Sequence, residues 1–152
     1  MPVAEKSADL LLVEDNQEEA KLLLTALKKN NPGKHILWID DGAKALKYLL
    51  SDKVKDTPGA DKKPLLVLLD LTLPNVSGFE ILEKIKHSKK ADGMDFIVIT
   101  GSQNESDRAR SYGYGVKLYM RKDIVCENCL KMQRGDKTDN SLLKIVNETY
   151  ED

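Results

Sequence analysis

Three short apolar runs constrain the fold of this chain most strongly, because each is followed at once by an acidic or hydroxyl side chain. They are Leu10–Val13 before Glu14 and Asp15, Leu65–Leu69 before Asp70, and Phe96–Ile99 before Thr100. Runs that are apolar on both faces predict the central strands of a parallel sheet that helices cover on both sides. Two weaker candidates, His35–Ile39 and Lys117–Arg121, bring the predicted strands to five.

Segments with a helical spacing of apolar residues follow these strands. They are Glu18–Lys29, Asp41–Leu50, Gly78–His87, Asn104–Tyr112 and Ser141–Tyr150. Strands that alternate with helices in this way predict βαβ units with right-handed crossovers. We therefore expect an α/β fold, a three-layer, doubly wound sandwich around a five-stranded parallel sheet.

A length of 152 residues predicts one domain. We expect residues 1–8 to be a flexible N-terminus and residues 9–150 to be a single domain. Within it, residues 52–63 predict an exposed loop and residues 123–140 an extended loop. No chain is then left over for an output domain that binds DNA or catalyses a reaction, so a stand-alone domain is expected.

Composition excludes several classes of protein. The 24 Lys and Arg residues are matched by 25 Asp and Glu residues, which argues against a nucleic-acid binder. The chain has no apolar N-terminal signal segment and no apolar run near the roughly 20 residues that span a bilayer. Two Cys residues are too few for a disulfide scaffold. We expect a soluble, cytoplasmic protein without nucleic-acid or membrane partners.

Polar residues stand at the predicted carboxyl ends of the strands, where an open doubly wound sheet has its ligand crevice. If the first and third strands are neighbours, Glu14, Asp15 and Asp70 converge in one small pocket. Like charges so close raise each other's pKa unless a cation lies among them. Mg²⁺ suits such a site because it prefers hard oxygen ligands. The sequence therefore predicts a magnesium site.

The same constellation suits phosphoryl transfer. A carboxylate such as Asp70 can form an aspartyl-phosphate, and the transferring oxygens need cations and donors around them. Lys122 can supply an ammonium group, and Thr100 can supply a hydroxyl group. The alternative for any single residue is a helix cap or a solvated turn.

The Cys126-x-x-Cys129 pair could indicate a redox or a zinc site. A zinc site needs four ligands, and the two His residues, His35 and His87, belong to other elements. We interpret the two thiols as a coincidental pair on a loop. An intermolecular disulfide or a metal shared in a dimer stays open.

Four segments together resemble the receiver domain of response regulators in two-component signalling, of the chemotaxis-regulator type. They are residues 11–16 (LLVEDN), 68–78 (LLDLTLPNVSG), 97–101 (IVITG) and 118–122 (LYMRK). The resemblance covers roughly residues 9–150 and implies a flavodoxin-like fold. It implies a phosphorelay in which a histidine kinase or phosphotransfer protein is the donor, and a protein that catalyses only its own phosphorylation and dephosphorylation.

The resemblance also implies a role for each matching residue. Asp70 corresponds to the phosphoacceptor and Lys122 to the phosphate-binding lysine. Thr100 corresponds to the switch hydroxyl and Tyr119 to the switch aromatic. The metal ligands would be Glu14, Asp15, Asp70 and the backbone carbonyl of Thr72, and the residues that tune reaction rates would be Thr72 and Ser102.

The family's output face is its fourth helix, fifth strand and fifth helix, which would contact a downstream protein or a second copy in a homodimer. Asp123 follows Lys122 where the family usually has Pro, so the Lys122–Asp123 peptide could be cis or trans. This departure, the extended loop and the stand-alone chain together resemble the regulators found beside bacterial phytochrome-type kinases. The absence of Pro after Lys122 also leaves open a second function, that of a phosphorylation-independent interaction module. A phosphohydrolase is disfavoured, because Thr72 stands where its second catalytic acid would be.

Overall fold

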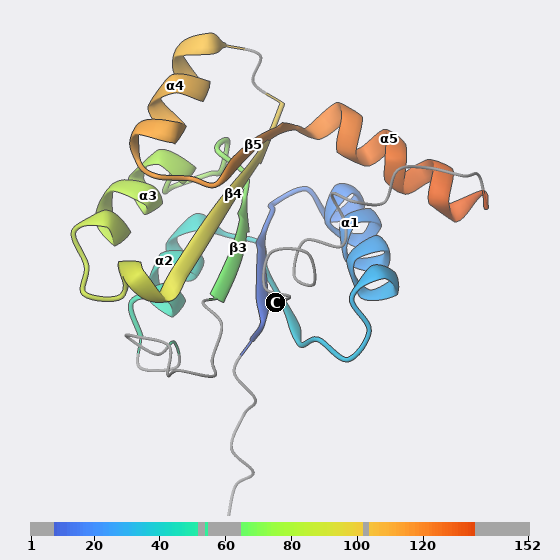
Figure 1. The fold of residues 1–152 in the computed structure, drawn as a ribbon, viewed down its shortest axis with the longest axis horizontal. Coiled ribbons are helices and arrows are strands. Elements are labelled where there is room, and N and C mark those ends of the chain that lie inside the picture. The colour runs from blue at the N-terminus through green and yellow to red at the C-terminus, as the bar shows by residue number, and fades with distance from the viewer. Residues whose placement is uncertain (1–7, 52–53, 55–64, 102–103, 136–152) are drawn as a thin grey trace, which may run out of the picture.

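The computed structural model describes residues 8–51, 54, 65–101 and 104–135. Within these residues five parallel strands form one sheet with the order β2-β1-β3-β4-β5 (Figure 1). The strands are β1 (Leu10–Val13), β2 (Ile36–Ile39), β3 (Leu65–Leu69), β4 (Met94–Thr100) and β5 (Leu118–Arg121). The predicted five-stranded parallel sheet is confirmed, and β1 and β3 are neighbours as expected.

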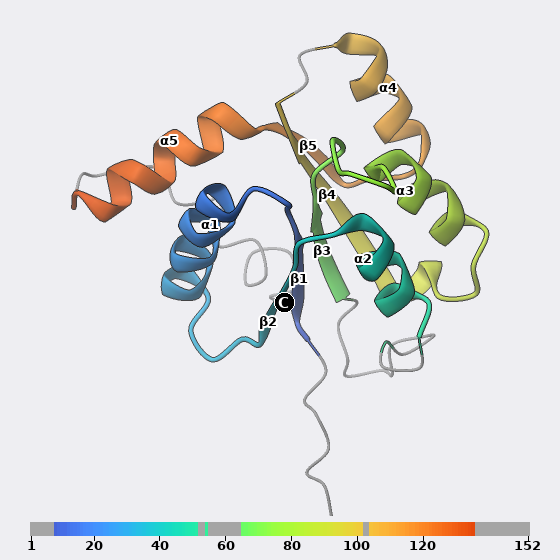
Figure 2. The ribbon, with the colours of Figure 1, turned by 180° about the vertical axis from the view of Figure 1, so that it is seen from behind.

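Helices cover both faces of the sheet, as the two views in Figures 1 and 2 show. On one face lie α1 (Gln17–Asn30) and α5 (Lys122–Gln133). On the other face lie α2 (Gly42–Leu49), α3 (Gly78–Lys86) and α4 (Glu105–Gly113), and a short 3₁₀ turn, η1 (Ala91–Gly93), precedes β4. This is the three-layer α/β sandwich predicted from the sequence.

The alternation of side chains along β1 divides the core into two layers. Leu10 and Leu12 belong to the cluster that packs under α1 and α5. Leu11 and Val13 belong to the cluster that packs under α2 and α3. Because both faces of the strand are buried, all four of its positions must be apolar, which explains the uninterrupted run.

Side-chain caps set the start of the helices that lead away from the strand ends. The Asn16 side chain accepts a hydrogen bond from the Glu19 backbone N–H at 3.0 Å and begins α1. Asp41, Ser77 and Asn104 cap α2, α3 and α4 in the same way. The cap at Asn16 places the first turn of α1 next to the end of β1.

The expectation of an extended loop at 123–140 is wrong for its first part, because α5 occupies Lys122–Gln133. Val125, Cys129 and Met132 recur at helical spacing and are buried in the cluster beneath α1. Both Cys residues are free, and burial raises the pKa of Cys126 to about 11 and of Cys129 to about 12. Both thiols therefore lie on a helix rather than on a loop, and Cys129 is part of its packing.

Several sequence predictions fall on residues outside the described part of the chain. They are the N-terminus up to residue 7, most of the 52–63 loop, Ser102, residues 136–140 of the predicted loop and the Ser141–Tyr150 helix. Among the helices that the structure does describe, none combines the length and apolarity needed to cross a membrane.

Candidate acidic site at the sheet edge

The parallel register of β1 and β3 brings two acidic residues together. Val13 pairs with Leu69, so the next residue of each strand, Glu14 and Asp70, emerges at the same edge of the sheet. Glu14 is 1% exposed and Asp70 is 4% exposed, whereas Asp15 is exposed. One carboxylate oxygen from each of the three lies within 4.8 Å of the others. The predicted acidic cluster is present.

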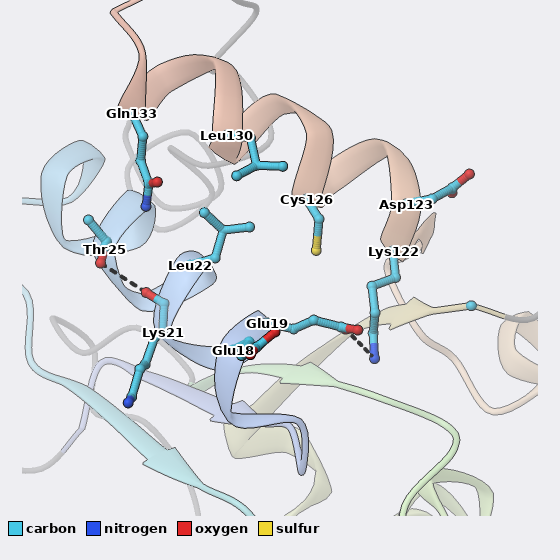
Figure 3. A pocket seen from close by; sticks show the side chains of 11 residues that line it. Glu18, Glu19, Lys21, Leu22, Thr25, Lys122, Asp123, Cys126, Leu130 and Gln133 are labelled. Carbon is cyan, nitrogen blue, oxygen red and sulfur yellow. Dashed lines mark hydrogen bonds and ion pairs between the residues drawn. The ribbon is translucent and has the colours of Figure 1, made fainter.

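Lys122 reaches into this cluster from the first residue of α5. Its Nζ lies 2.7 Å from Asp70 Oδ2 and 2.8 Å from Glu14 Oε1. It also lies 3.0 Å from Glu19 Oε2, a contact drawn in Figure 3. Three carboxylates thus lie within ion-pair distance of one ammonium, and the contact of Glu19 Oε2 is one of charge without a hydrogen bond. In the described residues every peptide bond is trans, including the one between Lys122 and Asp123.

Burial and charge shift the pKa values of this site in a consistent way. Burial, with the nearby charge of Asp70, raises the pKa of Glu14 to about 7, although its hydrogen bond with Lys122 opposes the shift. Burial acts to lower the pKa of Lys122, but the hydrogen bonds and charges of Asp70 and Glu14 outweigh it and raise that pKa. The site therefore holds a permanent cation and a carboxylate that takes up a proton near neutral pH.

The raised pKa of Glu14 predicts how stability depends on pH in the absence of metal. The folded chain keeps a proton on Glu14 up to pH about 7, while the unfolded chain releases it near the ordinary value of 4.5. The folded state binds more protons across this window, so the unfolding free energy should fall as pH rises from about 4.5 to 7. Urea unfolding in EDTA at several pH values should show this slope, and Glu14→Gln should flatten it. Equal slopes in both proteins would contradict the shift.

The backbone after Asp70 is held in place by close contacts. The Thr72 N–H donates to Asp70 Oδ1 at 3.0 Å. The Gly78 N–H donates to the Leu71 carbonyl at 3.0 Å. A Cβ on Gly78 would lie 2.6 Å from the Asp70 carbonyl oxygen, so only glycine fits at the start of α3. These contacts hold the Asp70 carboxylate toward Lys122.

The other predicted site residues lie on neighbouring strands. Thr100 ends β4 and is fully buried at 0% exposure, and Tyr119 lies in β5. The Tyr119 backbone N–H donates to the Tyr112 hydroxyl of α4 at 3.2 Å. The Thr72 side chain is exposed. The structure therefore gathers Glu14, Asp15, Asp70 and Lys122 into one cluster and places Thr100 and Tyr119 on the two adjoining strands.

Two residues of this site were missed by the sequence reasoning. Glu19 contacts Lys122, and the single Trp of the chain, Trp38, donates its Nε1–H to the Glu14 carbonyl at 2.9 Å. The spacing Asn16-x-x-Glu19 resembles a capping box, in which the N3 glutamate turns back toward the start of its helix. That signal could have placed the Glu19 side chain near the strand ends.

The comparisons with known proteins agree with this geometry. The family model of the response regulator receiver domain matches residues 10–134. The probable methanogenesis regulatory protein FilR2 of Methanothrix harundinacea is 36% identical over 125 residues, which cover 82% of this chain and 78% of FilR2. Response regulator Rcp1 of Synechocystis is 32% identical over 127 residues, covering 83% of this chain and 84% of Rcp1.

Solved structures show the same likeness. The structure of the bacteriophytochrome response regulator AtBRR is 33% identical and has a TM-score of 0.59, covering 83% of this chain and 94% of AtBRR. The Mn²⁺-bound form of Rcp1 is 28% identical with a TM-score of 0.63, covering 93% of this chain and 91% of that one. These relatives support the predicted likeness to phytochrome-associated regulators. The chain belongs to the response regulator receiver domain family of two-component signalling.

Proposed function

We propose that Asp70 accepts a phosphoryl group from a histidine kinase or phosphotransfer protein, with Mg²⁺ bound beside it. One observation carries the proposal. Lys122 Nζ lies 2.7 Å from Asp70 Oδ2 in a site where the carboxylate oxygens of Glu14, Asp15 and Asp70 fall within 4.8 Å of one another. A buried carboxylate, a cluster of hard oxygen donors and an ammonium group thus lie together, which supports the proposed acceptor, metal and phosphate-binding roles.

The donor set fits a divalent cation. Three carboxylates at the strand ends, together with the backbone carbonyl of Thr72, would supply the hard oxygen ligands that Mg²⁺ prefers. Bound there, Mg²⁺ would neutralise negative charge on the transferring phosphoryl oxygens. The Mn²⁺-bound structure of Rcp1 supports this assignment, because that relative is a response regulator of the same family.

The residues of the chain then have distinct duties. A carboxylate oxygen of Asp70 attacks the phosphorus of a phosphohistidine, the new O–P bond forms, and the P–N bond to the donor imidazole breaks. The imidazole nitrogen keeps the electron pair of that bond and takes a proton. Lys122 donates to a phosphoryl oxygen, and the Thr72 N–H holds Asp70 Oδ1. Later attack by water on the phosphorus returns Asp70 and releases phosphate, at a rate that Thr72 and Ser102 tune.

The phosphoryl group would act as a switch for binding. The Thr100 hydroxyl would donate to a phosphoryl oxygen, and Tyr119 would turn inward on β5 in response. The affected surface is the α4–β5–α5 face, where Tyr112 is 40% exposed with the Arg108 guanidinium 5.9 Å from its ring centre. Exposed Tyr and Arg side chains suit a protein interface. A downstream protein or a second copy of this chain would bind the α4–β5–α5 face in response to phosphorylation. The phosphoryl donor would be a phytochrome-type kinase in the cytoplasm.

The first test is a measurement of intact mass. The protein is incubated with acetyl phosphate in Mg²⁺ or in EDTA, and a gain of one phosphoryl group is expected in Mg²⁺ alone. The physical reason is that the clustered carboxylates and the donor phosphate repel one another without a divalent cation. No gain in either buffer or from a phosphorylated histidine donor, with the fold intact by circular dichroism, would refute the proposal and favour a phosphorylation-independent interaction module.

A further inference from the structure

Among the described residues, three carboxylates contact the Lys122 ammonium, and one of the three has no other assigned duty. Asp70 Oδ2 and Glu14 Oε1 belong to the acceptor and the proposed metal ligands. Glu19 Oε2, at 3.0 Å, belongs to neither. Figure 3 shows the Glu19 and Lys122 side chains pointing toward each other from α1 and α5.

We propose that Glu19 is a positioning residue that keeps the Lys122 ammonium in the site while Glu14 and Asp70 engage a cation. This inference rests on the proposed function, because it assigns a duty to Glu19 in the same site. Lysine and a divalent cation would compete for the same oxygens of Glu14 and Asp70. Glu19 offers the ammonium a carboxylate that the competition does not involve.

The placement of Glu19 suits this duty. Its backbone N–H is held at 3.0 Å by the Asn16 cap, so its side chain starts from a fixed point in the first turn of α1. The side chain is 34% exposed, which leaves its charge only partly screened by water. Asp123, the acid adjacent to Lys122, is instead paired with Arg121 at 2.7 Å and is 62% exposed. Asp123 therefore does not replace Glu19.

The surroundings of Lys122 explain why it needs an anchor. Lys122 and Glu19 help to line an open groove of about 760 Å³ between α1 and α5, with Leu22, Cys126 and Leu130 farther along it (Figure 3). A lysine side chain is a flexible four-carbon stem, so its ammonium can take up many positions. Without Glu19, the ammonium can stay on Glu14 and Asp70, where it opposes a cation, or swing into the groove, away from the phosphoryl group.

Positioning can be separated from a simple charge effect by a double-mutant cycle. If every group kept its place, removing the Glu19 charge would change Mg²⁺ affinity by the same factor with or without Lys122. A different factor in the two backgrounds means that the two side chains act on the cation through each other, as expected if the ammonium moves when Glu19 is lost. The coupling between Glu19 and Lys122 is therefore the signature of a positioning role.

The experiment compares Mg²⁺ affinity in the wild type, Glu19→Gln, Lys122→Met and the double variant. Dissociation constants come from the Mg²⁺-dependent gain in unfolding free energy. The fluorescence of Trp38, which bonds the Glu14 carbonyl, is a second readout. Glu18→Gln is the matched control, because Glu18 is exposed and carries the same charge in the same helical turn. It reports the effect of charge near the site and the helix N-terminus.

We expect Glu19→Gln to weaken Mg²⁺ binding about fivefold when Lys122 is present. In the Lys122→Met background, the same substitution should weaken Mg²⁺ binding less than about twofold. Glu18→Gln should change it less than about twofold. Equal factors in the two backgrounds, or equal effects of Glu18→Gln and Glu19→Gln, would overturn the inference. In saturating Mg²⁺, Glu19→Gln should also slow acetyl phosphate labelling several-fold.

The inference and the proposed function fail in different ways. If the double-mutant cycle shows coupling between Glu19 and Lys122 but the wild type gains no phosphoryl group, the positioning role stands and the phosphoacceptor role is refuted. If the wild type gains a phosphoryl group and the cycle shows no coupling, the phosphoacceptor role stands and the positioning role is refuted. The Mg²⁺ affinities do not depend on phosphorylation, so each result is read separately.

Discussion

Asp70→Asn is expected to reduce phosphoryl labelling by acetyl phosphate at least about 100-fold, to the background of the assay. Asparagine keeps the shape of the side chain but its amide oxygen is a poor nucleophile and a weaker metal ligand. The variant also removes the negative charge from the 2.7 Å contact between Lys122 Nζ and Asp70 Oδ2. Intact mass after a fixed incubation in Mg²⁺ measures the loss directly.

Asp40→Asn is the matched control for this result. Asp40 follows β2 at the same edge of the sheet as Asp70, but it is exposed and does not belong to the acidic cluster. Its labelling should equal that of the wild type. Circular dichroism and the fluorescence of Trp38 check that both variants fold. Full labelling of Asp70→Asn would show that another residue accepts the phosphoryl group.

Lys122→Met is expected to change three properties in different directions. Its side chain is 15% exposed, and its loss leaves Glu14 and Asp70 buried without their cation. Breaking such a pair costs about 3–5 kcal/mol, and proton uptake by Glu14 offsets part of this near neutral pH. Mg²⁺ affinity should rise because the competing ammonium is gone. Phosphorylation should slow about 100-fold because a donor to the phosphoryl oxygens is lost.

These expectations are checked by urea unfolding in EDTA and in Mg²⁺, and by the initial rate of labelling. Tighter Mg²⁺ binding should make the stability gained from Mg²⁺ larger in Lys122→Met than in the wild type. Lys117→Met is the control, since Lys117 pairs with Asp95 at 3.3 Å and is 48% exposed, so its loss should cost less than about 1 kcal/mol. A variant as stable as the wild type in EDTA, with unchanged labelling, would contradict the assigned role of Lys122.

The layers of the fold could be predicted because local pattern and burial agree. The Leu65–Leu69 run is apolar at every position, and all five residues are buried between two layers of helices. The start of α4 has an equally local cause, since the Asn104 side chain accepts a hydrogen bond from the Ser106 N–H in the first turn. In both cases the physical cause lies within a few neighbouring residues or in the two-residue period of a strand.

The helix at Lys122–Gln133 could not be predicted with the same ease. Its apolar stripe is narrow, and the Cys126-x-x-Cys129 pair also fits a redox or zinc motif, so the helical spacing of Val125, Cys129 and Met132 is not the only pattern in this segment. Tertiary packing stabilises this segment as a helix, because these three side chains complete the hydrophobic cluster under α1. The contact between Asn30 Nδ2 and Met132 Sδ at 3.8 Å joins residues 102 positions apart. No local pattern encodes such a contact.

The sequence by itself determined the parallel sheet, the acidic residues at its edge and the family resemblance, because each depends on residue type, strand period and motif order. Tertiary structure alone decided which groups share the Lys122 ammonium. Glu19 and Lys122 meet because α1 and α5 pack side by side, and that packing depends on the sheet beneath them. The free energy of an ion pair depends on distance and burial, which exist only after the chain has folded.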